Sequence, residues 1–153
     1  MINVTLVSQV FLHEPDQEYD PSKPNFSVKQ EMEIGDDNTM KACLPEANAY
    51  AVDVEAGARK KLKILAISVP DEPFEGTLLF ALAADAPTDQ RIDLSDSKVY
   101  TGQALFDLLE FKERLDTVYF WRCGCENPVE IKIFSGRDIT PYASPAPTAM
   151  KKN

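Results

Sequence analysis

Hydrophobic and polar residues alternate with a period of two along most of the chain. The segments 26–34 and 49–55 show this most clearly, because their even positions are mostly apolar and their odd positions mostly small or polar. Such alternation is typical of a strand with one buried and one solvated face. It also predicts strands at residues 2–12, 40–44, 61–69, 77–84, 117–123 and 129–135.

Four segments depart from simple alternation. Leu65–Val69 is apolar at most positions of both parities, as in a central strand, and Pro70 ends it. The sequence Ala56-Gly57-Ala58 suggests a turn. Residues 124–128 are rich in turn formers, which predicts a β-hairpin of the strands 117–123 and 129–135. Leucines and phenylalanines between Leu105 and Phe111 recur at helical spacing and predict a short helix near residues 102–112.

These elements predict an all-β protein. Many short strands without strand and helix alternation favour an antiparallel β-sandwich of jelly-roll or immunoglobulin-like type, and a closed barrel is the alternative. We expect one sandwich domain over residues 1–140, with an acidic, proline-containing loop at 14–25. The Pro/Ala-rich residues 141–153 are expected to form an extended C-terminal arm.

Composition narrows the range of partners. With 153 residues, 44% of them hydrophobic, the chain has the size and apolar content of one globular domain. Its net charge is −9, and the segment 14–37 carries eight acids against two lysines. This acidic balance argues against direct nucleic-acid binding. No apolar run reaches eighteen residues and the N-terminus is uncharged, so we expect neither a membrane partner nor export.

The three cysteines predict no disulfide framework, which fits a chain made in a reducing compartment. Cys123 and Cys125, with Cys43 and His13 added, would supply four zinc ligands, but their spacing is not that of a structural zinc site. We therefore expect neither a metal nor a cofactor. Burial as small residues at one end of the sandwich is the favoured interpretation of Cys123 and Cys125, and a disulfide to another subunit is a further alternative.

Candidate catalytic residues are few. His13 is the single histidine and precedes a loop, so nucleophilic catalysis would depend on one residue at a loop edge. The acidic pairs Asp36-Asp37 and Asp71-Glu72, and the nearby Asp93 and Asp96, lie outside any calcium-loop motif and are expected to be solvated. The sequence therefore predicts a protein that is not an enzyme.

Two aromatic residues admit two interpretations. Tyr119 and Trp121 share one face of a predicted strand, where exposed rings would form a platform for a sugar or an anchor for a partner. Burial under the helix predicted from Leu105 is favoured, because that helix has an apolar excess.

The run TVYFWRCGCENPVEIKIFSGRDITP, which follows AYAVDVEAGARKKLKILAISV, resembles the final strands of small β-sandwich structural proteins of phage virions. The resemblance is one of general strand pattern and covers residues 49–140. The helix-forming TGQALFDLLEFKERL departs from a sandwich that is made of strands alone. It implies a capsid decoration, minor capsid or tail component with no cofactor and no catalytic residues. Other copies of the chain, or a major capsid or tail protein, would be its partners. It would be synthesised in the host cytoplasm and located in the virion.

On this interpretation the loop and the arm extend over neighbouring subunits. Prolines restrict the free arm and so lower the entropy that it loses on docking. A carbohydrate- or ligand-binding module that uses Tyr119 and Trp121 is the alternative, and a hydrolase is third. The interface residues expected for the virion role are Tyr19 in the loop and Pro141, Tyr142, Pro145, Pro147, Lys151 and Lys152 in the arm.

Overall fold

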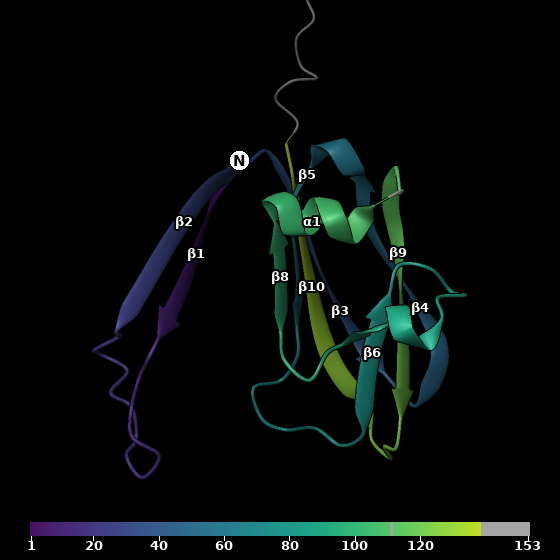
Figure 1. The fold of residues 1–153 in the computed structure, drawn as a ribbon. Coiled ribbons are helices and arrows are strands. Elements are labelled where there is room, and N and C mark those ends of the chain that lie inside the picture. The colour runs from purple at the N-terminus through teal and green to yellow at the C-terminus, as the bar shows by residue number, and fades with distance from the viewer. Residues whose placement is uncertain (111, 139–153) are drawn as a thin grey trace, which may run out of the picture. The chain divides into compact units, whose positions relative to one another are not determined.

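The computed structural model describes residues 1–110 and 112–138. Within them the chain divides into two compact units, Met1–Ile34 and the residues from Gly35 onward. The sequence predicts one sandwich domain over residues 1–140, whereas the structure builds its two large sheets entirely from the second unit. The first unit is a β-hairpin (Figure 1).

The hairpin consists of β1 (Ile2–Val10) and β2 (Phe26–Ile34). The strands pair antiparallel, with Ile2 opposite Ile34 and Val10 opposite Phe26. Both strands were expected from the alternation, and residues 14–25 form the predicted loop between them. Three prolines limit regular pairing in this loop, which instead contains local turns.

The second unit contains two antiparallel four-stranded sheets, whose layers are visible in Figure 1. Sheet I has the order β3 (Asp36–Leu44), β10 (Val129–Arg137), β5 (Leu62–Ser68) and β8 (Lys98–Thr101). Sheet II has the order β4 (Ala47–Ala58), β9 (Arg114–Cys123), β6 (Thr77–Ala81) and β7 (Ile92–Asp93).

One hydrophobic core joins the two sheets. Alternate positions of the strands are buried in it, as the period of two requires. Sheet I contributes Leu65, Ile67, Ile131 and Ile133, and sheet II contributes Val52, Val54, Leu78, Phe80, Val118 and Phe120. The fold is therefore all-β with antiparallel sheets packed around a shared core, as predicted. The jelly-roll or immunoglobulin-like type stays a prediction.

The predicted helix is present as α1 (Gly102–Leu109), and it lies across one end of the sheets (Figure 1). Leu105 and Leu109 are buried in the shared core, one helical turn apart. Glu110 takes a positive φ of 42° and ends the helix. Two short 3₁₀ turns, η1 (Arg59–Lys61) and η2 (Thr88–Gln90), complete the regular structure of the described residues.

Two expectations about turns are wrong. The strands β9 and β10 do not form a hairpin, because β9 pairs with β4 and β6 whereas β10 pairs with β3 and β5. Residues 124–128 instead carry the chain from one sheet to the other. Residues 56–58 belong to the end of β4, and the turn follows them at η1.

Candidate interaction surface

The hairpin separates apolar and polar side chains onto two faces. In an antiparallel pair, residues that lie directly opposite share a face of the sheet. The register therefore places Val10 with Phe26 and, one pair further on the same face, Ser8 with Val28. The apolar face consists of Ile2, Val4, Leu6, Val10, Phe26, Val28, Met32 and Ile34, with Ser8 and Gln30 among them. The other face is mostly polar and carries Glu31, Glu33 and Lys29 beside Val7.

The apolar face is exposed in the half that lies next to the tip loop. The side chains of Phe26 and Val28 are 62% and 66% exposed, and Leu12, just beyond β1, is 66% exposed. Val10 is 49% exposed. We call these four residues the hairpin patch. A two-stranded hairpin is marginally stable in water by itself, and contiguous exposed apolar side chains commonly mark interaction sites.

The tip loop holds a small ordered group around Tyr19. The Tyr19 ring lies 4.7 Å from the ring of Phe11 and 6.0 Å from that of His13, between ring centroids. His13 Nδ1 lies 2.6 Å from the Gln17 carbonyl oxygen. Tyr19 remains 52% exposed, and its role in an interface stays a prediction. These contacts give the loop local order.

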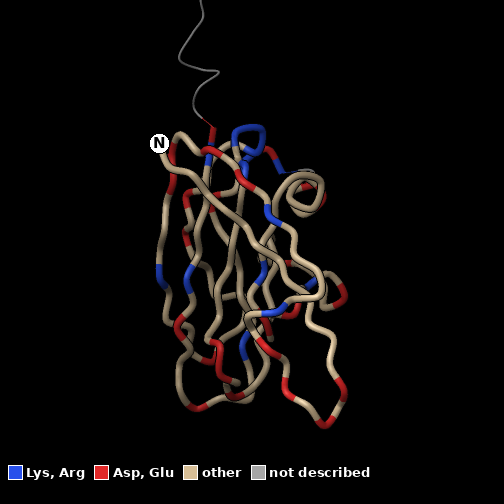
Figure 2. The backbone as a smooth tube through the Cα atoms, turned by 90° about the vertical axis from the view of Figure 1, so that its left-hand side faces the viewer, with Lys and Arg blue, Asp and Glu red and all other residues tan. Residues whose placement is uncertain are grey.

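Acidic side chains dominate the same loop (Figure 2). Asp20 accepts hydrogen bonds from the Ser22 hydroxyl at 2.7 Å and from the Ser22 main-chain N–H at 2.9 Å. These bonds favour the carboxylate, and they hold the pKa of Asp20 below its ordinary value. The loop therefore places negative charge directly beside the hairpin patch.

The expected contact residues of the arm, Pro141, Tyr142, Pro145, Pro147, Lys151 and Lys152, lie outside the described residues. Their role in an interface stays a prediction. Tyr19 is thus the expected interface residue that the structure describes.

Trp121 is buried, but not by the helix. It is 7% exposed and packs with Ala81 and Ala86 in a small cluster separate from the shared core. The Arg91 guanidinium covers its ring, with 4.1 Å between Cζ and the ring centroid. Tyr119 lies at the border of this cluster. A stacking platform needs an open ring face, and Trp121 has none to offer.

The expectation that Cys123 and Cys125 are buried is wrong. Cys43 and Cys123 are exposed and Cys125 is half-buried. Cys43 occupies an outward position of β3, where alternation directs its neighbours Ala42 and Leu44 toward the core. Among the described residues, no group of three or more metal-ligating side chains is close enough to hold an ion.

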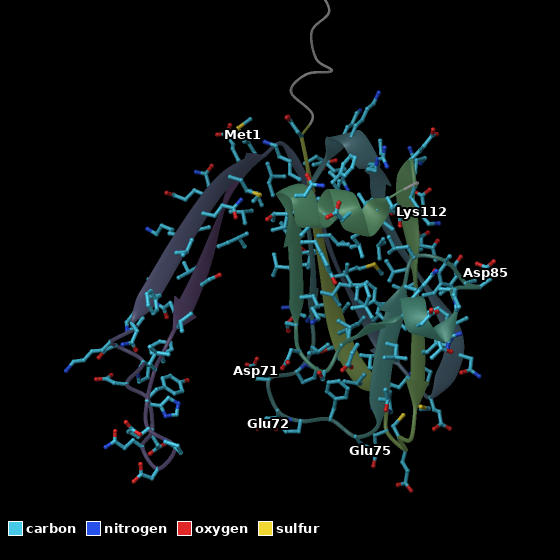
Figure 3. The ribbon with its side chains drawn as sticks, viewed as in Figure 1. Met1, Asp71, Glu72, Glu75, Asp85 and Lys112 are labelled. Carbon is cyan, nitrogen blue, oxygen red and sulfur yellow. The ribbon has the colours of Figure 1, made fainter. Side chains whose placement is uncertain are left out.

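Some of the expected acidic groups line a cavity of about 550 Å³ beside the loop between β5 and β6, whereas Asp36 and Asp37 lie in β3. Asp71 and Glu72 project from this loop (Figure 3), and Asp93 and Asp96 line the same cavity. Hydroxyls of Ser95, Ser97 and Thr77 also face it. The negative charge of the lining suits a cation or a protonated amine. The described carboxylates, however, show no arrangement that selects a particular ligand.

Two buried or half-buried arginines were not identified from the sequence. Arg122 is 3% exposed and donates from Nη1 to the Leu44 carbonyl at 2.7 Å and from Nη2 to the Glu75 carbonyl at 3.1 Å. Arg137 Nη2 pairs with Asp36 Oδ2 at 2.8 Å. The alternation of β9 holds the signal for Arg122, because Val118, Phe120 and Arg122 share one parity and hence one inward face.

Comparison with family models, curated proteins and solved structures found no match to this chain. The class that the fold defines is thus a two-sheet antiparallel β protein with an N-terminal hairpin. None of the helices in the described part of the chain has the length and apolar character needed to cross a membrane.

Proposed function

We propose that the chain is a structural subunit of a virus particle, such as a capsid decoration, minor capsid or tail component, and that it acts through contacts between subunits. The observation that carries this proposal is the hairpin patch, which exposes four large apolar side chains beside an acidic loop. A protein that stays bound to neighbouring subunits can bury such a surface against them. The resemblance of residues 49–140 to phage sandwich proteins adds the virion context.

The sandwich and the hairpin are proposed to contribute differently to these contacts between subunits. The sandwich has a continuous core drawn from both sheets, which makes it a rigid body. The hairpin is a separate compact unit with little core of its own, so a neighbour that covers its apolar face adds most to its stability. The proline-rich arm is proposed as a second contact.

The test uses particles purified on a density gradient from cells that produce this chain. We expect the chain to migrate with the particles at a fixed copy number relative to the major capsid or tail protein. Its absence from the particles overturns the proposal. Deleting residues 141–153 is expected to leave the sandwich folded, as judged by circular dichroism, and to lower incorporation.

The hairpin patch is tested in the same experiment. The double change Phe26→Ser and Val28→Ser removes its two most exposed strand residues, and we expect a clear loss of incorporation. Val7→Ser is the matched control, because Val7 is 55% exposed and lies on the opposite face of the same hairpin. Equal incorporation of both variants would show that the patch makes no contact in the particle.

A further inference from the structure

The outer face of sheet I carries an apolar row that is bordered by positive charge. Register places Phe134 of β10 directly beside Ala66 of β5, and Ala66 directly beside Val99 of β8. The three side chains therefore form an apolar row across three neighbouring strands. Val99 is 51% exposed, and Phe134 and Ala66 are half-buried. An exposed apolar row on a sheet face can pack against another apolar β surface.

Two lysines border this row. Lys41 of β3 and Lys132 of β10 lie directly opposite each other, two residues along from the apolar row on the same face. Both are exposed, and like charges at directly opposite positions are destabilising. A carboxylate placed between them would relieve this repulsion. The step along the strands from the apolar row to the lysines is about 7 Å.

The hairpin presents the complementary order. Its patch of Val10, Leu12, Phe26 and Val28 is followed, toward the tip, by the acids Glu14, Asp16, Glu18 and Asp20. The hairpin therefore has an apolar patch followed by negative charge, and the outer face of sheet I has an apolar row followed by positive charge. Complementary patterns of this kind fix the orientation of one surface on another.

The link between the two units favours a second copy as the partner. Gly35 is the single residue between β2 and β3, so the Cα atoms of Ile34 and Asp36 lie at most about 7 Å apart. Packed β layers are separated by about 10 Å. A hinge this short would be strained if the hairpin folded back onto sheet I of its own chain. It therefore favours exchange of the hairpin between two copies. A two-fold exchange also uses the contact twice, which doubles the buried area.

We propose that the hairpin patch of one copy docks on the outer face of sheet I of a second copy, over Phe134, Ala66 and Val99, with the tip-loop acids against Lys41 and Lys132. This inference rests on the proposed function, since it names the partner of the same surface. The product is a hairpin-exchanged dimer, or a longer chain of copies if the exchange does not close.

The test is the solution mass of the purified chain by light scattering. We expect a mass of at least twice the 17.1 kDa of one chain. The double change Phe26→Ser and Val28→Ser removes the donor surface, and it is expected to reduce the mass to that of one chain. Val7→Ser, on the opposite face, is expected to leave the mass unchanged. The proposal is overturned if the unmodified protein has the mass of a single chain at every protein concentration, up to about 10-fold above that of the particle experiment.

A second pair of variants tests the acceptor surface. Lys41→Glu together with Lys132→Glu reverses the charge next to the apolar row, and we expect this protein to be a monomer as well. Ala51→Glu, at an exposed position of β4 in sheet II, is the control and should keep the full mass. If the lysine variant keeps its full mass, the hairpins pair with each other or with another surface, and the proposal is wrong.

Mixing the hairpin variant with the lysine variant distinguishes the donor surface from the acceptor surface. The hairpin variant retains a normal acceptor surface and the lysine variant retains a normal hairpin, so a mixture is expected to recover association that neither has alone. Failure of the mixture to associate, with both variants folded by circular dichroism, contradicts docking of hairpin on sheet. The outcomes also separate this inference from the proposed function. A monomer that still enters particles overturns the inference alone, and a dimer that stays out of particles overturns the function alone.

Discussion

Arg122 links three elements through its guanidinium group. It extends from β9 into the end of the core, and its two terminal nitrogens donate to the Leu44 carbonyl at the end of β3 and the Glu75 carbonyl just before β6. Its Nε has no hydrogen-bond partner among the described residues. The Phe74 ring lies 5.9 Å from its Cζ, between ring centroid and carbon. The side chain therefore holds two loop ends in place from within the core.

We expect Arg122→Met to lower the free energy of unfolding by about 2–4 kcal/mol. The change removes two charge-assisted hydrogen bonds and leaves two main-chain carbonyls without a partner, which outweighs the gain from no longer burying a charge. Denaturant unfolding measures the difference. Arg114→Met on the same strand is the control, because the Arg114 side chain is 63% exposed and its pair with Asp116 is solvated. We expect less than about 0.5 kcal/mol there, and equal losses would refute the assigned role.

Residue positions were easier to predict than residue surroundings. Alternation correctly places Tyr119 and Trp121 on one face and Val118 and Phe120 on the other, since the period of a strand is fixed. It does not say what covers each face. Trp121 is covered by Arg91, by Ala81 at the end of β6 and by Ala86 in the segment after it, and part of that contact depends on a loop path that no periodicity encodes. The prediction for Cys123 failed for the same reason, since Cys123 shares the parity of Trp121 but the residues that cover Trp121 leave it exposed.

At the level of elements, α1 contributes to the core through one stripe of side chains. Leu105 and Leu109 are buried, whereas Phe106 is 56% exposed and lies over the Arg59 guanidinium, with 5.1 Å between Cζ and the ring centroid. We expect Leu109→Ala to cost about 2–5 kcal/mol of stability through the cavity that it leaves. Phe106→Ala removes an exposed cation–π contact and should cost less than about 1 kcal/mol. Urea unfolding of the two variants, compared at equal protein concentration, distinguishes them. If Phe106→Ala costs as much as Leu109→Ala, the helix packs by a different face.

The strands predicted from alternation are present, but their partners were not predictable. The strands β9 and β10 are adjacent in sequence and each contributes apolar residues to the core, which suggested a hairpin. They satisfy the same pattern from opposite sheets, because a core between two sheets accepts inward residues from either side. Polar residues obscured the first part of β3 in the sequence, because Asp36 and Asp37 are both exposed and give no apolar signal. The strands β7 and β8 have two and four residues and were too short for a period to show.

At the scale of the whole molecule, the two units differ in what stabilises them. The buried residues of the shared core all come from Leu44 or later, and the partly buried residues packed against them come from Met40 or later. The hairpin, by contrast, buries little within its own 34 residues and gains most from a neighbour. This asymmetry predicts that removing residues 1–34 changes association while the sandwich stays folded.

Tryptophan fluorescence allows this to be measured. Trp121 is the single tryptophan of the chain and lies in the sandwich, so its signal follows the unfolding of that unit. We expect the chain 35–153 to unfold cooperatively, with a midpoint that does not depend on protein concentration. In the full chain the midpoint should rise with concentration, because association stabilises the folded state by mass action. A truncated chain with no cooperative transition would show that the sandwich needs the hairpin, and a full chain with no concentration dependence would show that the hairpin adds no contact between copies.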